Sequence, residues 1–135
     1  MSVYYVDTSA ALKLLVEESD SQAFAHFYDE HADSTWVSSA LLRIEVLRAV
    51  RRALPAALAD AQDLLLAFDY VAVDDDVISA AGDAPGANLR SLDAIHLVTA
   101  QLFEAELAGL ATYDDRLARA ARSAGLKVVS PRDSA

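Results

Sequence analysis

The chain has 135 residues, of which 54% are hydrophobic, no cysteine and a formal net charge of −10. This length fits one domain, residues 1–135, and the lack of cysteine excludes disulfides and thiolate metal sites. No apolar run approaches the roughly 20 residues of a membrane span, and no leader segment is recognisable, so we expect a cytoplasmic protein. The acidic charge favours a basic protein partner over nucleic acid, and the hydrophobic excess favours a buried oligomer interface.

Short runs typical of β-strands alternate with helical stretches along the whole chain. Strands that alternate with helices predict an α/β fold, in which a mostly parallel sheet of about five strands is covered by helices on both faces. In chain order we expect a strand at 3–6, helices over about 10–16 and 21–30, a strand at 34–38, helices from 38 or 39 to about 53 and from 55 to about 68, a strand at 70–73, a helix starting at 74–76, a loop over 82–88, a helix over about 91–105, a strand at 110–112, a helix over about 115–123, a turn at 125 and a strand at 128–129.

Four acidic residues lie at the edges of apolar segments rather than in solvated runs: Asp7, Glu45, Asp93 and Asp114. A carboxylate held near a core is costly unless it is paired, hydrogen-bonded or bound to a cation. Asp7 and Asp114 follow predicted strands, and ligands bind outside the carboxyl ends of strands in open α/β sheets. Two strand-end acids and two helix-borne acids can therefore converge on one pocket.

The two strand-end acids also have a structural interpretation, because Asp is a good N-cap for a helix. Thr8 or Ser9 could cap the first helix in place of Asp7, and Asp115 could cap the later helix in place of Asp114. With these neighbours as caps, both acids would be free for other contacts.

The two helix-borne acids could instead be ion-paired. Glu45 lies three residues before Arg48, a spacing that permits a salt bridge worth a few tenths of a kcal/mol. Asp93 falls in the first turn of a predicted helix, where the helix dipole favours negative charge, and Arg90 could pair with it. His96, on the same face, could be a packed residue bonded to a carbonyl or water, a partner of a ligand, or a ligand itself.

Clustered carboxylates repel one another and raise one another's pKa values, and a divalent cation removes that repulsion. Oxygen-only ligands select a hard ion such as Mg²⁺ or Mn²⁺, which acidifies water and stabilises charge on a phosphoryl group. Metal-assisted phosphodiester hydrolysis is the predicted chemistry. Despite the net charge, arginines gather on two predicted helices, the first with Arg43, Arg48, Arg51 and Arg52 and the second with Arg116, Arg119 and Arg122.

Four segments match motifs of a known family: VDTSA at 6–10, SSALLRIEV at 38–46, RSLDAIHL at 90–97 and TYDDRL at 112–117. Together they resemble PIN-domain ribonucleases, and more narrowly VapC-type toxins of bacterial toxin–antitoxin pairs. The resemblance implies a three-layer α/β/α sandwich and a Mg²⁺- or Mn²⁺-dependent endoribonuclease. Asp7 and Asp93 would be the most direct metal ligands, and Glu45 and Asp114 would complete the pocket, partly through water.

The resemblance also implies supporting groups and partners. The partners would be a second copy of the chain, structured RNA cut at a single-stranded loop, and an antitoxin whose basic tail enters the acidic pocket. RNA carries phosphates, which a chain of net charge −10 repels. Arginines on the Glu45 helix would therefore have to supply the phosphate contacts. The supporting hydroxyls would be Thr8, Ser9 and Thr112, and the RNA-binding residues Arg43, Arg48, Arg51 and Arg52.

Two other classes of function remain open. A phosphoryl-receiving signalling domain needs a pair of acids after the first strand and a Lys after the fifth, whereas only Asp7 follows the first strand and Lys127 precedes the last. An Asp-x-Asp phosphatase fails similarly, because Ser9 takes the place of the second acid. A non-catalytic module could use the same acidic pocket only to capture a basic peptide.

Overall fold

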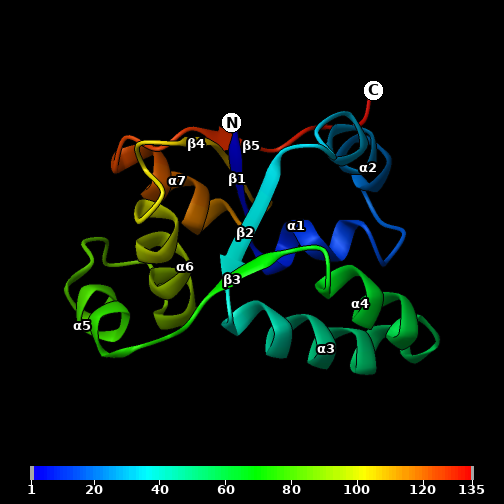
Figure 1. Ribbon diagram of the computed structural model, residues 1–135, viewed down its shortest axis with the longest axis horizontal. Coiled ribbons are helices and arrows are strands. Elements are labelled where there is room, and N and C mark those ends of the chain that lie inside the picture. The colour runs from blue at the N-terminus through cyan, green and yellow to red at the C-terminus, as the bar shows by residue number, and fades with distance from the viewer. Residues whose placement is uncertain (1, 135) are drawn as a thin grey trace.

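The computed structural model describes residues 2–134; the predicted domain bounds include residues 1 and 135, which lie outside the described residues. Five strands form one parallel sheet in the order β3-β2-β1-β4-β5 (Figure 1). The strands are β1 (Val3–Val6), β2 (Thr35–Ser39), β3 (Asp69–Val71), β4 (Leu107–Ala111) and β5 (Val128–Val129).

Helices cover both faces of this sheet, with α1 to α4 on one side and α5 to α7 on the other (Figure 1). The predicted α/β fold with a sheet between two helical layers is confirmed. No helix among residues 2–134 is long and apolar enough to cross a membrane. The helices are α1 (Thr8–Lys13), α2 (Ser21–Glu30), α3 (Leu41–Ala53), α4 (Leu58–Leu65) after a 3₁₀ turn η1 (Pro55–Ala57), α5 (Asp75–Asp83), α6 (Ser91–Gln101) and α7 (Asp115–Ser123).

The central strand β1 shows how the sequence builds the two cores. Its side chains alternate between the faces of the sheet, as strand geometry requires. Tyr4 and Val6 pack into the core formed with α1 to α4, and Val3 and Tyr5 into the core formed with α6 and α7. Because β1 is apolar on both faces, it lies at the centre of the sheet, and the residue after it is held firmly in place.

Several element ends differ from the predictions. The third helix starts at Leu41 rather than at Ser38 or Ser39, because these two serines still pair with β3 in the sheet. Ala40 is the N-cap and makes no side-chain cap bond, although the Leu41 amide donates to Ser39 Oγ. The other corrections are that α1 covers 8–13, β2 covers 35–39, α4 ends at 65 after a separate 3₁₀ turn, β3 covers 69–71, α5 ends at 83 within the predicted loop, α6 ends at 101 and β4 begins at 107.

Strand β4 begins earlier than its propensity indicates. Ala108 and Gly109 are weak strand formers, yet pairing with β1 draws them into the sheet. A Cβ at Gly109 would lie 3.0 Å from Val129 Cγ1, so this position needs a residue without a side chain. The close β1–β4–β5 packing aligns the carboxyl ends of β1 and β4, where Asp7 and Asp114 follow.

Candidate active site

Asp7, the residue after β1, is buried with only 4% of its surface exposed. Its Oδ1 accepts from the Ala10 amide at 2.9 Å and from Ser9 Oγ at 2.8 Å, and its Oδ2 accepts from Thr112 Oγ1 at 2.5 Å. Asp7 is therefore the N-cap of α1, and the expectation that Thr8 or Ser9 would cap it is wrong. Burial raises the pKa of Asp7, while His96 and these donors oppose that rise.

Asp114 occupies the equivalent place after β4 and also caps a helix. Its Oδ1 accepts from the amides of Arg116 at 2.9 Å and Leu117 at 3.1 Å, so Asp115 is not the cap of α7. The Asp114 amide in turn donates to Thr112 Oγ1 at 3.0 Å. Thr112 thus ties both strand-end acids together, one through its carboxylate and the other through its backbone.

Glu45 projects from the second turn of α3 and is half-buried. Its Oε1 accepts from Thr8 Oγ1 and pairs with His96 Nε2, each at 2.7 Å. Among the described residues its ion-pair partner is His96, so the proposed pairing with Arg48 is wrong. Glu45 is held from two directions, by the residue after Asp7 and by a residue one turn beyond Asp93.

His96 is buried and joins Glu45 to the centre of the sheet. Its Nδ1 lies 2.7 Å from the Tyr5 hydroxyl, which accepts from the Ser39 amide at 3.1 Å. Burial raises the pKa of Tyr5, so its hydroxyl keeps its proton and can donate it to Nδ1. The His96 proton then lies on Nε2 and points at the Glu45 carboxylate, an arrangement assigned from this hydrogen-bond pattern. His96 is bonded to two side chains, not to a carbonyl or water.

Asp93 lies in the first turn of α6 and is half-buried. Burial raises its pKa, and the nearby charges of Asp114 and Glu45 raise it further. A hydrogen bond with the Arg90 backbone and the electrostatic influence of the His96 ring act in the opposite direction. Among the described residues, no salt bridge joins the Arg90 guanidinium to Asp93. Asp93 therefore lies close enough to two other acids to interact with them electrostatically.

Residues 4–123 of this chain match a known family model, that of the PIN domain. The chain belongs to the PIN-domain family. The family predicted from the four motifs is confirmed.

Named relatives of this PIN domain come from Mycobacterium tuberculosis. It is 41% identical over 129 residues to "Ribonuclease VapC35", covering 94% of this chain and 96% of that protein. It is 40% identical over 131 residues to "Ribonuclease VapC46", covering 97% and 99% of the two chains. The resemblance thus extends over nearly the whole length of this chain and of each VapC protein.

Solved structures share the fold at low sequence identity. The crystal structure of VapC20 from M. tuberculosis, described as a Sarcin-Ricin loop cleaving toxin, has a TM-score of 0.71 at 17% identity and covers 95% of this chain and 99% of that one. The FitAB complex bound to an IR36 DNA fragment gives 0.73 at 16% identity, with 98% and 97% covered. At these identities the likeness supports the PIN fold alone.

The acids of this PIN domain fit a hard cation by their chemistry. They offer oxygen donors only, and their mutual repulsion is a cost that a divalent ion would offset. Yet within residues 2–134 no three His, Cys, Asp or Glu side chains already stand as a ligand set. Among the described residues, Asp93 interacts with Asp114 and Glu45, and Thr112 links Asp114 to Asp7, but these acids form no closed metal cage.

The predicted RNA-binding arginines lie along α3 of the PIN domain and are exposed. The Arg43 guanidinium lies over the Tyr70 ring, 4.8 Å from its centroid, which directs it toward β3. Arg48 is about one turn beyond Glu45, and Arg52 is about 10 Å further along the helix axis than Glu45. The arginines of α3 thus extend away from the acids instead of surrounding them.

Tyr5 is the residue of this network that the sequence did not identify. It looks like one more apolar strand residue, and it lies 91 positions from His96. A polar tip on a fully buried strand residue is the available signal, because such a hydroxyl needs a partner.

Proposed function

We propose that this PIN domain is a Mg²⁺- or Mn²⁺-dependent endoribonuclease that acts as the toxin of a toxin–antitoxin pair. One observation carries the proposal: Asp93 interacts electrostatically with Asp114 and Glu45, and Thr112 links Asp114 to Asp7, in a chain about 40% identical to proteins named ribonucleases. A pocket of carboxylates repels RNA unless a cation is present, so the acids themselves argue for metal dependence.

In this proposal Asp7 and Asp93 are the most direct metal ligands, and Glu45 and Asp114 complete the pocket, partly through water. The ion, when bound, lowers the pKa of a water molecule and stabilises the charge that develops on the phosphoryl oxygens. Oxygen ligands without nitrogen or sulfur favour Mg²⁺ or Mn²⁺ over softer metals.

The residues around the acids have defined tasks. Ser9, Thr112 and the Ala10 amide fix both oxygens of Asp7, so its carboxylate cannot rotate. Among the described residues, both hydrogen bonds to Glu45 go to Oε1, which leaves Oε2 to accept a proton from, or orient, the attacking water. Hydrolysis would leave a 5′-phosphate and a 3′-hydroxyl.

The alternatives are less well supported. A phosphoryl-receiving domain needs an acid pair after β1, but hydroxyl residues follow Asp7, and Ser9 and Thr112 use their hydroxyls to hold it. A module that only captures a basic peptide does not explain why Glu45 is fixed by both Thr8 and His96. Restraint of this kind is what positions groups for chemistry.

The proposed partners are RNA, an antitoxin with a basic tail and a second copy of this chain. The acidic pocket offers charge complementarity to an arginine of the antitoxin. Large apolar side chains remain exposed on several helices, among them Ile44 at 60% and Leu92 at 47%, each next to a pocket acid. A protein partner that covers the pocket would also cover these two residues.

The test compares the wild type with Asp93→Asn and with Asp115→Asn, which removes a charge from an exposed neighbouring position that caps nothing. Purified proteins are incubated with total cellular RNA and Mn²⁺, and the RNA ends are sequenced. We expect discrete cuts from the wild type and Asp115→Asn, loss of those cuts with Asp93→Asn, and loss with chelator. Equal cutting by Asp93→Asn and the wild type would refute the proposed site.

A further inference from the structure

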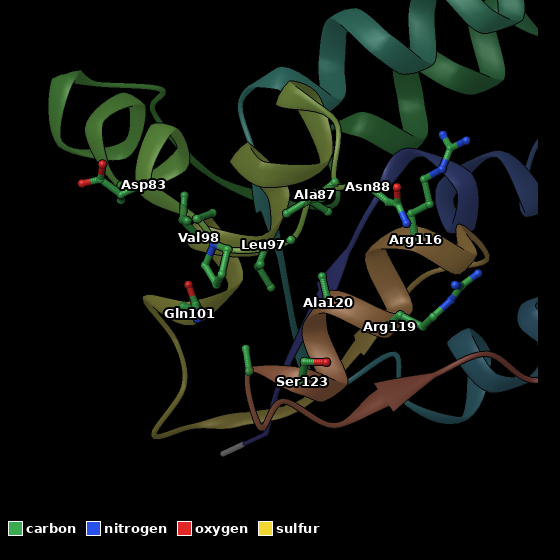
Figure 2. A pocket seen from close by; sticks show the side chains of 16 residues that line it. Asp83, Ala87, Asn88, Leu97, Val98, Gln101, Arg116, Arg119, Ala120 and Ser123 are labelled. Carbon is green, nitrogen blue, oxygen red and sulfur yellow. The ribbon is translucent and has the colours of Figure 1, made fainter.

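A pocket of about 650 Å³ lies between α6, α7, the end of α5 and the segment 84–89 (Figure 2). Its floor is apolar, with Leu97 and Val98 from α6 and Ala120 from α7. Figure 2 shows Arg116 and Arg119 at one end. This volume falls in the roughly 300–1,000 Å³ range of pockets that hold small ligands.

The arginine end of the pocket is next to the acids. Arg116 is two residues beyond Asp114, and its amide donates to the Asp114 carboxylate. Leu97 of the floor is one helical turn beyond Asp93. A ligand that occupied the pocket would therefore extend directly from the candidate active site.

The two ends of the pocket carry different polar groups. Arg116 and Arg119 are exposed, and no salt bridge among the described residues engages either of them. The opposite end carries Gln101, which offers an amide, and Asp83, whose carboxylate points away from the floor (Figure 2). The pocket thus suits a molecule with an anionic group at one end, an apolar flat body and hydrogen-bonding groups at the other.

We propose that this pocket binds one nucleotide of single-stranded RNA adjacent to the scissile phosphate. The nucleotide's phosphate contacts Arg116 and Arg119, its base lies on the apolar floor, and the base edge reaches Gln101. The inference rests on the proposed ribonuclease function, and it adds a second RNA-binding surface to the arginines of α3. Base contacts of this kind confer preference at one position beside the cut.

The first experiment measures binding of a fluorescently labelled pool of short single-stranded RNA, by anisotropy, to variants in the Asp93→Asn background. Arg119→Ala should reduce the slope of log affinity against log salt by about 0.7, the value for one lost phosphate contact. Ala120→Phe fills the floor and should weaken binding about tenfold, the order of one lost base contact. Arg122→Ala, on the same helix but outside the pocket, should match its parent.

The second experiment sequences RNA ends produced by the catalytically competent proteins with Mn²⁺. Ala120→Phe should change the base preference at one position beside the cut, while Arg119→Ala, which loses only a phosphate contact, and Arg122→Ala retain the wild-type preference. Thermal unfolding of each variant tests whether it is folded. Because Arg119 is exposed, the salt slope of Arg119→Ala still tests the pocket if Ala120→Phe does not fold.

The outcomes separate the two proposals. If the wild type does not cut RNA but binding still depends on Arg119 and Ala120, the ribonuclease proposal fails and the RNA pocket stands. Cutting by the wild type with binding and base preference unchanged in both pocket variants would overturn the pocket. So would variants that bind and cut RNA normally but escape inhibition by the antitoxin, because the pocket would then hold a peptide.

Discussion

Asp7 and Asp93 both have raised pKa values, yet their surroundings differ in a way that separates their contributions to stability. Asp7 is buried and its oxygens accept from Ser9, Thr112 and the Ala10 amide. Asp93 is half-buried, and beside burial its pKa is raised by the charges of other acids. The carboxylate of Asp7 is thus held by four hydrogen bonds within the fold, whereas that of Asp93 is disfavoured first by burial and then by repulsion from other acids.

Asp93→Asn should stabilise the metal-free protein at neutral pH, by up to about 1 kcal/mol at this half-exposed position. The pKa of Asp93 lies above the ordinary value of 3.8, so the folded protein holds this proton more tightly than the unfolded chain. The stability that results is present below pH 3.8 and is lost as the pH rises through the raised pKa. Denaturant unfolding in chelator should therefore show a gain for the variant that is absent near pH 3.8 and grows above it.

Asp7→Asn is the matched comparison and should have the opposite effect. An amide nitrogen would face either the hydroxyl donors or the Ala10 amide, so one buried donor would lose its acceptor. The free energy of unfolding should fall by about 1–3 kcal/mol in the same chelator experiment. A loss of stability for Asp93→Asn as large as that for Asp7→Asn would mean that Asp93 belongs to a structural ion pair instead.

Tyr5→Phe should weaken the hold on Glu45, because Tyr5 is hydrogen-bonded to His96 and His96 to Glu45. The change leaves His96 Nδ1 and the Ser39 amide without the shared hydroxyl, at a cost of about 1–3 kcal/mol in unfolding free energy. The His96 proton would no longer be directed to Nε2, so Glu45 would lose a fixed donor. We expect weaker Mn²⁺ binding by calorimetry and a lower kcat for RNA cleavage.

Tyr4→Phe, at the neighbouring position of β1, provides the control, because among the described residues no hydrogen bond engages the Tyr4 hydroxyl. It should leave Mn²⁺ affinity and kcat at wild-type values. If Tyr5→Phe changed only stability and left Mn²⁺ binding intact, the chain of hydrogen bonds through His96 would be structural and nothing more.

At the scale of elements, the sequence predicted what depends on local pattern and missed what depends on pairing. The bounds of α2 and α7 follow from local sequence pattern and were predicted correctly. The start of β4 was missed because Ala108 and Gly109 enter the sheet only through β1. The convergence of acids followed from strand ends, but the Glu45–His96 pair joins positions 51 apart, and sequence pattern carries no information about which polar atoms meet.

The helix α3 is expected to act as a second RNA-binding element. Arg48 and Arg51 are exposed and lie on the helix that carries Glu45. Replacing both by Glu should weaken RNA binding and reduce the salt slope by at least about 1.4, the value for two lost contacts with single-stranded RNA. Anisotropy over a range of salt concentrations checks this, and an unchanged slope would show that RNA does not follow α3.

At the scale of the whole molecule, the C-terminal segment ties the start of α2 to the candidate active site. Ser130 Oγ donates to the Thr112 carbonyl and the Tyr113 hydroxyl donates to the Pro131 carbonyl, each at 2.6 Å. Further along, Asp133 accepts from the amides of Asp20 and Ala23 and so substitutes for a cap that the Asp20 side chain does not provide. One short segment therefore bears on both helix α2 and the loop that holds Asp7.

One substitution and one truncation should separate the support of α2 from the support of the loop after β4. Asp133→Ala removes only the contacts to α2 and should cost about 1 kcal/mol of unfolding free energy, the usual value of a lost cap, with Mn²⁺ affinity unchanged. Stopping the chain after Val129 also removes Ser130 and Pro131, which support residues 112 and 113. Since Thr112 donates to Asp7, this shorter chain should both unfold more easily and bind Mn²⁺ more weakly. Equal Mn²⁺ affinity in calorimetry for the wild type and the shorter chain would show that β4 alone holds Thr112 in position.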